Sequence, residues 1–201
     1  MLVNAKHLFF FVGRTASGKE TQSTKLAELL GYQLFMTGAK FREMIASGSQ
    51  LGERIRVDYE RGLLMPAWVA NYMLEHFLFN LPAEQGAVFE GSGRDVDQAQ
   101  TIEKVCAWLG REYTVFNLDV SEDEVIRRSL ARGRSDGLDR NEHTIRIRLE
   151  EYSRTTSHAI EEFKRLGKLV TVNGEQPPEI VHAEVMQHVH REELKKADRA
   201  D

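Results

Sequence analysis

A glycine-bounded loop near the amino terminus has the composition of a phosphate-binding site. Gly13 and Gly18 enclose four residues, Lys19 follows directly, and the apolar residues 9–12 precede them. The glycines allow the backbone to curl so that its amides point inward, and the next helix adds the positive end of its dipole. Lys19 can then reach the β and γ phosphates of a nucleotide. A strand–turn–helix junction that needs glycine for geometry alone is the alternative, and the apolar strand followed by Gly-x4-Gly-Lys favours phosphate binding.

Glu20 stands where the strict form of this loop has a serine or threonine that helps to hold Mg²⁺, and Thr21 follows it. A carboxylate about 7 Å from a phosphate charge is repelled by about 0.6 kcal/mol in a water-like medium and about 2.4 kcal/mol at an effective dielectric constant of about 20. We therefore expect the Glu20 side chain to point to solvent. In that position it also gains about 0.3–1 kcal/mol from the helix dipole.

The elements that must position this loop alternate short apolar runs with longer helical segments, which indicates an α/β fold. Near-continuous apolar runs are typical of parallel strands that are buried on both faces. The expected strands are 7–12, 33–36, 87–90, 113–119 and 168–172. The expected helices are 18–30, two short pieces within 39–61, 66–80, 96–110, 122–132, 142–166 and 178–195. We predict a single three-layer domain, 1–201, whose central parallel sheet of about five strands is flanked by helices.

Composition restricts the class of protein. The 201 residues are 41% hydrophobic and 29% charged, as in an ordinary globular domain, and no apolar stretch reaches the roughly 18 residues of a membrane span. The single cysteine, Cys106, excludes an internal disulfide and a cysteine-based zinc site, and it fits a reducing cytoplasm. The net charge of −4 argues against a general nucleic-acid binder. We expect a cytoplasmic monomer with no nucleic-acid or membrane partner.

The phosphate loop resembles that of the adenylate kinase family, which reads Gly-x-Pro-Gly-x-Gly-Lys-Gly-Thr-Gln. The matching residues are Gly13, Gly18, Lys19, Thr21 and Gln22. The departures are Thr15, Ala16 and Glu20. In that family the threonine is offset by one residue from the strict pattern, as Thr21 is here.

Two later segments resemble the family's flap over the nucleoside monophosphate. Residues 36–42, Met-Thr-Gly-Ala-Lys-Phe-Arg, are similar to Thr-Gly-Asp-x-x-Arg, in which the threonine contacts the AMP base and the arginine its phosphate. Thr37 and Arg42 match, and Ala39 replaces the aspartate. Residues 62–66, Gly-Leu-Leu-Met-Pro, are similar to the family's Gly-x-Leu-Val-Pro turn. The resemblance implies a helical monophosphate-binding flap at 37–66.

Residues 90–98, Glu-Gly-Ser-Gly-Arg-Asp-Val-Asp-Gln, are similar to the family's Asp-Gly-Phe-Pro-Arg-x-x-x-Gln. The resemblance implies that Glu90 binds Mg²⁺ through water, Arg94 grips the AMP phosphate and Gln98 reads the edge of the adenine. Ser92 and Gly93 replace Phe-Pro, and we expect this change to loosen the turn. The AMP site implied by these segments is Thr37, Gly38, Arg42, Met65, Gly91, Arg94 and Gln98.

Arginines surround the expected lid. Arg128 and Arg132 lie four apart on one helical face and match arginines that cover ATP in the family. Arg148-Leu149-x-x-Tyr152 matches its lid-closing Arg-Leu-x-x-Tyr. Each helical arginine has an alternative role in an i,i+4 ion pair on a solvated face. The arginine-rich run could also contact RNA, which the lack of an aromatic platform and the net acidity disfavour.

The lid itself, 133–142, is short enough to be a loop without zinc. The family's Arg-x-Asp-Asp appears as Gly137-Leu138-Asp139-Arg140, so one arginine is absent and Arg140 is a candidate substitute. Near the carboxyl terminus, Val172-Asn173-Gly174 resembles the turn beside the ATP adenine.

The resemblance, which extends over nearly the whole chain, implies a Mg²⁺-dependent kinase that transfers the γ-phosphoryl group of ATP to AMP. Thr37 and Gln98 favour AMP over UMP or CMP. The implied ATP site is Gly13, Ala16, Ser17, Gly18, Lys19, Glu20, Thr21, Arg128, Arg132 and Gly174, and the implied metal-binding oxygens belong to Thr21 and Glu90. Phosphoryl transfer needs alignment and charge neutralisation, and the candidates for it are Lys19, Arg94, Arg128, Arg132 and Arg148. A kinase for another acceptor and a degenerate nucleotide-binding protein remain alternatives.

Overall fold

The computed structural model describes residues 6–132 and 141–197, with side chains as far as residue 191. Within these residues one sheet is formed by β1 (Leu8–Gly13), β2 (Gln33–Met36), β3 (Ala87–Glu90), β4 (Tyr113–Asp119) and β5 (Leu169–Asn173). All neighbouring strands are parallel, in the order β2-β3-β1-β4-β5. β1 pairs with β3 on one side and with β4 on the other. The phosphate loop therefore leaves the middle of the sheet, at the kind of switch point where α/β folds bind ligands.

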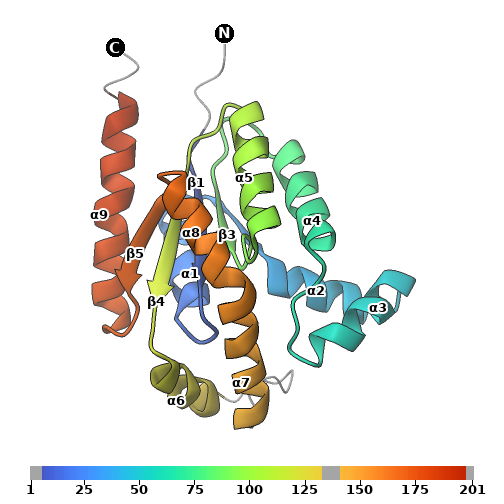
Figure 1. The fold of residues 1–201 in the computed structure, drawn as a ribbon. Helices are drawn as coiled ribbons and strands as arrows, with labels where there is room; N and C mark the ends of the chain where they lie inside the picture. Colours follow the sequence, from blue (N-terminus) through green and yellow to red (C-terminus); the bar gives the residue numbers. More distant parts are fainter. Residues whose placement is uncertain (1–5, 133–140, 198–201) are drawn as a thin grey trace.

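The sheet lies between two hydrophobic cores because successive β1 side chains point to opposite faces. Leu8, Phe10 and Val12 pack in a core that includes α4 (Ala67–Asn80), α5 (Val96–Trp108) and α8 (Ser157–Arg165). Phe9 and Phe11 pack in a second core with α1 (Lys19–Leu30) and α9 (Pro178–Ala197). The predicted three-layer α/β fold is confirmed (Figure 1). Cys106 is fully buried, as expected of a small apolar residue.

Two short helices project sideways from the body of the protein, as Figure 1 shows. They are α2 (Thr37–Ala46) and α3 (Gln50–Tyr59), and Phe41 and Ile55 attach them to the first core. The Ser49 hydroxyl caps α3 by accepting from the Gly52 amide. α2 begins two residues before the predicted position, so that Thr37 lies directly at the carboxyl end of β2. The following Pro66, expected inside the first turn of α4, instead precedes that helix as its N-cap residue.

A second lobe at the same edge of the sheet consists of α6 (Glu122–Arg132) and α7 (Glu142–Glu151). Val125 of α6 packs with Ile145 and Leu149 of α7 in a small separate core. The residues between these helices, 133–140, lie outside the described residues, so the predicted lid, with Gly137 and Arg140, is not part of this description. None of the helices within the described ranges is long and apolar enough to cross a membrane.

One prediction about the helices is wrong. The sequence predicts a continuous helix over 142–166, whereas a π-helical turn, η1 (Tyr152–Thr156), separates α7 from α8. Hydroxyl groups in this segment bond backbone carbonyls four residues earlier, Thr155 to Glu151 at 2.6 Å and Ser157 to Ser153 at 2.6 Å. Such bonds compete with the regular helical pattern. π turns inside α-helices are frequent at functional sites.

Candidate functional site

Two adjoining cavities lie at the carboxyl edge of the sheet. The larger, of about 700 Å³, is bordered by the phosphate loop, α1, the start of α2, the end of β3, and α6 and α7. The smaller, of about 60 Å³, lies between α2, α3 and the turn after β3. Both are lined by Gly38, Tyr59, Leu64 and Arg94. Two ligands, one in each cavity, would thus come close to each other beside Arg94.

The predicted site residues divide between these cavities. The large cavity is lined by Gly13, Ala16, Ser17, Gly18, Lys19, Glu20, Thr21, Gly38, Arg42, Glu90, Arg94, Arg128, Arg132 and Arg148. The small one is lined by Thr37, Gly38, Met65, Gly91, Arg94 and Gln98. Gly174 lines neither, and its carbonyl oxygen accepts a 2.9 Å hydrogen bond from Arg128. The structure therefore gathers the expected residues, while their individual roles stay predictions.

The phosphate loop folds around the Lys19 side chain. Gly13 has a φ of 136° and Gly18 a φ of 94°, and a Cβ atom at Gly13 would lie 2.6 Å from the Leu118 carbonyl oxygen. Glycine is therefore required at Gly13, where the loop passes β4 closely. Lys19 is only 7% exposed, and its Nζ atom donates to the Arg14 carbonyl oxygen at 2.5 Å and to the Ser17 hydroxyl at 3.3 Å.

Burial lowers the pKa of Lys19 from 10.5 to about 7. The Glu90 carboxylate opposes this shift, and the charges of Arg94, Arg148 and Arg132 add to it. An amine that loses its proton this readily lies in a region with an excess of positive charge and little water. A bound polyphosphate would supply the missing negative charge, and it would raise the pKa of Lys19 again.

Glu20 is exposed at the rim of the large cavity, as the charge argument requires, and Thr21 beside it is also exposed. Glu90 is half-buried and also lines the large cavity. Among the described residues there is no cluster of three or more histidine, cysteine or acidic side chains that could hold a metal ion. Any Mg²⁺ here would accordingly depend mainly on phosphate and water oxygens, as is usual for this ion.

Arg14 lines neither cavity, but its side chain makes contacts within the phosphate loop's surroundings that the sequence reasoning missed. Its guanidinium donates to the Val120 carbonyl oxygen at 3.0 Å and lies 3.4 Å from an Asp119 carboxylate oxygen. The same group stacks 4.8 Å from the centre of the Tyr152 ring. Arg14 thus ties the phosphate loop to the end of β4 and to η1. The family pattern allows any residue at this position, so no sequence signal pointed to it.

Arg128 makes the ion pair weighed as its alternative role and also lines the large cavity, while its contact with ATP stays a prediction. Its Nε atom donates to Glu124 at 2.6 Å, in the i,i+4 ion pair expected of a helical arginine, while the residue also lines the large cavity. Hydrogen bonds from Arg127 and Arg128 hold the pKa of Glu124 at about 2. Arg42, on the flap side, is exposed and donates to the Tyr59 hydroxyl at 3.2 Å.

Hydrogen bonds hold the turn after β3 in place. The expectation that Ser92 and Gly93 loosen this turn is therefore wrong. The Ser92 and Thr37 hydroxyls are both buried and lie 3.0 Å apart. The Gly93 amide donates to the Gln98 side-chain oxygen at 3.1 Å. A proline at this position has no N–H and could not make that bond. Gly93 has a φ of 79°, and a Cβ atom there would lie 2.9 Å from Phe163.

Comparison with known proteins agrees with this geometry. A family model for adenylate kinase matches residues 11–168. Adenylate kinase 1 of Synechocystis sp. is 36% identical over 172 residues, which cover 85% of this chain and 90% of that protein. Adenylate kinase of Thermus thermophilus is 34% identical over 177 residues, covering 87% and 92%. That of Phocaeicola vulgatus is 32% identical over 181 residues, covering 89% and 96%. The chain belongs to the adenylate kinase family.

Proposed function

We propose that this protein transfers the γ-phosphoryl group of ATP to AMP and forms two molecules of ADP. The observation that carries the proposal is the pair of adjoining cavities, with the buried Lys19 in the wall of one and Arg94 between them. Phosphoryl transfer requires two phosphate groups to be held in line in a site rich in fixed positive charge. The family relationship supports the same reaction.

In this proposal the large cavity takes the donor. The loop amides and Lys19 would bind the β and γ phosphates of ATP, and Arg128 and Arg132 would cover them. Arg132, Arg148 and Arg94 all lie close enough to Lys19 to affect its pKa. A transferring phosphoryl group near Lys19 would therefore lie within the field of these arginines, which is where the developing charge needs stabilisation.

The small cavity takes the acceptor base. Apolar side chains of Phe41, Leu63, Leu64, Met65 and Ala70 line it together with the polar side chains of Thr37, Tyr59, Arg94 and Gln98. The acceptor phosphate would then lie beside Arg94, with Arg42 on the flap side of the large cavity. Arginine suits this task because its planar fork binds two phosphate oxygens at once.

Mg²⁺ fits the oxygens available in the large cavity, which Glu90 and Thr21 both line. Glu90 would hold the ion through water and Thr21 would contribute its hydroxyl. When bound with ATP, the ion would neutralise phosphate charge during transfer.

Residues 37–66 would act as a flap and 133–142 as a lid within one kinase domain, since water in an open site would hydrolyse ATP. The end of the flap already approaches α7, because a Cβ atom at Gly62 would lie 3.1 Å from the Arg148 side chain. We also propose that the protein acts as a monomer in the cytoplasm.

A coupled assay with ATP, Mg²⁺ and a panel of acceptors tests the proposal. The panel contains AMP, GMP, CMP, UMP and adenosine. We expect two ADP per ATP consumed with AMP, much slower reaction with the pyrimidine nucleotides and none with adenosine, which lacks the phosphate that Arg94 would hold. Binding of ATP without turnover of any acceptor would refute the kinase assignment. Faster turnover with another monophosphate would refute the choice of AMP.

A further inference from the structure

Arg14 joins three separate segments of the protein through one side chain. Its backbone belongs to the phosphate loop, and its guanidinium donates to the Val120 carbonyl oxygen at 3.0 Å, just after β4. The Cζ atom of the same group lies over the Tyr152 ring, 4.8 Å from its centre. Arginine can make both contacts at once, because its planar group stacks on a ring while its edge donates hydrogen bonds. The side chain thus connects the phosphate loop, the end of β4 and η1.

Tyr152 is directly attached to the helix that carries Arg148. It follows the last residue of α7, and its backbone amide donates to the Arg148 carbonyl oxygen. The two residues are four apart, so their side chains lie on one face of the helix. Both line the large cavity, and Arg148 is close enough to Lys19 to affect its pKa. A movement of Tyr152 would therefore move Arg148 relative to the phosphate loop.

The other end of η1 is bonded to the acceptor side of the site. Thr156, its last residue, is 3% exposed, and its hydroxyl donates to the Arg94 carbonyl oxygen at 2.9 Å. η1 therefore has the helix of Arg148 before it and the turn of Arg94 bonded to its end. Arg14 attaches the first residue of this segment to the phosphate loop.

A role in stability alone accounts poorly for the contacts of Arg14. Its Nε atom is buried and, within the part of the chain that the structure describes, has no hydrogen-bond partner. Its 3.4 Å ion pair is made with Asp119, whose side chain is 60% exposed, and exposed pairs contribute little to stability. A buried donor without a partner is rare in folded proteins and calls for another explanation. These contacts suit the fixing of an orientation better than the stabilisation of the fold.

We propose that Arg14 is a positioning residue, which holds the phosphate loop and α7 in the placement that brings Lys19 and Arg148 to the same phosphate groups. This inference rests on the proposed function, in which both cations act on the transferring phosphoryl group. Arg14 lines neither cavity, so it acts through Tyr152 and not by touching the nucleotide. Alignment of this kind matters because a displacement of about 1 Å can slow a reaction about 100-fold.

The kinetic test measures the effect of Arg14→Met in two backgrounds. In the otherwise unsubstituted protein it should lower kcat for ADP formation about 10- to 50-fold, with less than about threefold change in the KM for ATP, because alignment is lost and not a contact with the substrate. In the Arg148→Met background the same substitution should cost less than about threefold, because the group that Arg14 positions is already absent.

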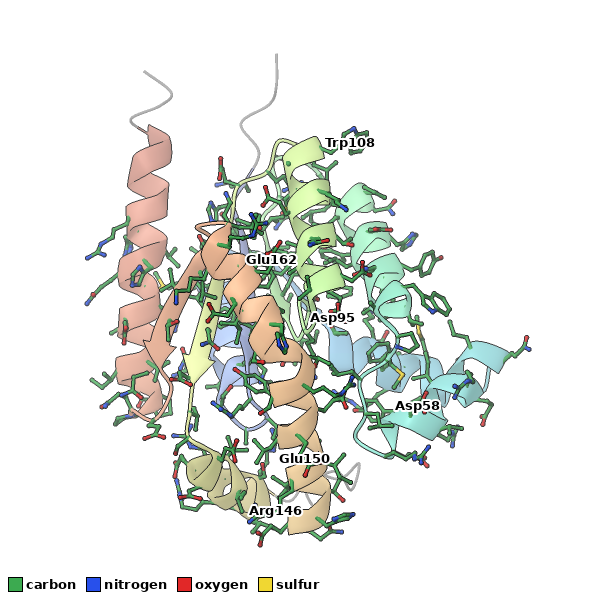
Figure 2. The ribbon with its side chains drawn as sticks, in the orientation of Figure 1. Asp58, Asp95, Trp108, Arg146, Glu150 and Glu162 are labelled. Carbon is green, nitrogen blue, oxygen red and sulfur yellow. The ribbon has the colours of Figure 1, made fainter. Side chains whose placement is uncertain are left out.

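Two kinetic outcomes would overturn the inference. Equal losses of kcat in the two backgrounds would show that Arg14 acts independently of Arg148. A loss that falls mainly on the KM for ATP would show that Arg14 contacts the nucleotide itself. Arg146→Met is the matched control, since Arg146 is exposed and pairs with Glu142 at 2.5 Å. Figure 2 shows Arg146 in the part of α7 away from the sheet, and its loss should leave kcat within about twofold.

Hydrogen exchange of the unliganded protein measures the same attachment without catalysis. The contact between Arg14 and Tyr152 is absent from both Arg14→Met and Tyr152→Leu. The amides of residues 148–156 should therefore exchange about 3- to 30-fold faster in either variant than in the unsubstituted protein. The variant with both substitutions should exchange no faster than the faster single variant, because the two changes remove one contact. Amides of α8 serve as the internal reference.

Unchanged exchange in Arg14→Met, or effects of the two substitutions that multiply, would contradict the proposed attachment. Urea unfolding of each variant shows that the compared proteins are folded. Absence of turnover in the unsubstituted protein would refute the proposed function itself. The exchange measurement would still decide whether Arg14 holds α7 to the phosphate loop, so failure of the inference and failure of the proposed function are distinguishable.

Discussion

Two buried cations at opposite ends of the sheet differ in the partners to which they donate hydrogen bonds. Lys19, at the carboxyl end of β1, is 7% exposed, and Arg111, just before the amino end of β4, is 6% exposed. Arg111 donates to four backbone carbonyls, those of Leu81 at 2.8 Å, Pro82 at 2.6 Å, Gln85 at 3.0 Å and Lys6 at 3.4 Å. Lys19 donates to one carbonyl and one hydroxyl.

The difference separates a structural cation from a ligand-binding one. The partners of Arg111 belong to the α4–β3 connection and to the segment before β1, so this side chain holds these two segments together. Lys19 lines a cavity, and its burial, together with the positive charges near it, lowers its pKa to about 7. A cation whose N–H groups all donate to backbone carbonyls stabilises the fold. A cation beside a cavity that keeps an N–H group for a ligand is suited to bind an anion.

The largest expected effect is on catalysis at Lys19. Lys19→Met should lower kcat for ADP formation at least about 10³-fold, because the substitution removes the central charge of the phosphate site. Lys164→Met is the matched control, since Lys164 is exposed on α8, where its Nζ atom lies 3.8 Å from a Glu161 carboxylate oxygen. More than a tenth of the original kcat in Lys19→Met would remove Lys19 from the mechanism.

Arg111 should show the opposite pattern. Arg111→Met should lower the free energy of unfolding by about 3–5 kcal/mol, because several buried carbonyls lose a charged donor. Turnover per folded molecule should stay within about twofold. Urea unfolding measures the loss, with Arg165→Met on the surface of α8 as control. A loss below about 1 kcal/mol, or loss of turnover in the folded variant, would contradict a structural role for Arg111.

The smallest effect is a gain in stability at Lys19. In the folded protein its pKa is about 7, against 10.5 in the unfolded chain. The unfolded chain therefore binds the extra proton between these pH values, and the penalty for burying the charge is complete below pH 7 and fades as the pH rises. Lys19→Met should raise the free energy of unfolding by about 1–3 kcal/mol at pH 6.5.

The same gain should shrink between pH 6.5 and pH 9.5. Arg111→Met should show no such trend, because an arginine stays charged throughout this range. A gain in Lys19→Met that grows with pH would show that the sign of the pKa shift is wrong.

The sequence predicted the fold well where local pattern determines it. Strands 33–36, 87–90 and 113–119 and helix 122–132 match the structure at both ends. Their apolar runs are bounded by glycine, proline or polar residues, which is the information that local reasoning uses. The gathering of Lys19, Arg94 and Arg148 beside one cavity followed from the family resemblance and not from any local pattern.

The missed features depend on contacts between distant segments. Arg111 bonds carbonyls up to 105 residues away, and Arg14 contacts the end of β4 and the Tyr152 ring. No local pattern contains such pairs. The tied turn at Gly93 was misjudged for a related reason, since the loss of proline was read as added freedom and not as an added N–H donor. The π turn coincides with hydroxyl side chains that bond backbone carbonyls, and a helical period does not distinguish these side chains.

Proton uptake on ATP binding tests the central claim most directly, because Lys19 must regain its proton when the phosphates arrive. Calorimetric titration at pH 8 in two buffers of different ionisation enthalpy gives the number of protons bound. With a pKa of about 7, the unliganded lysine is mostly neutral at that pH, so binding should take up about 0.9 proton. The Lys19→Met variant should take up no proton when it binds ATP, however weakly it binds. Absence of uptake in the unsubstituted protein, or equal uptake in both, would contradict the account.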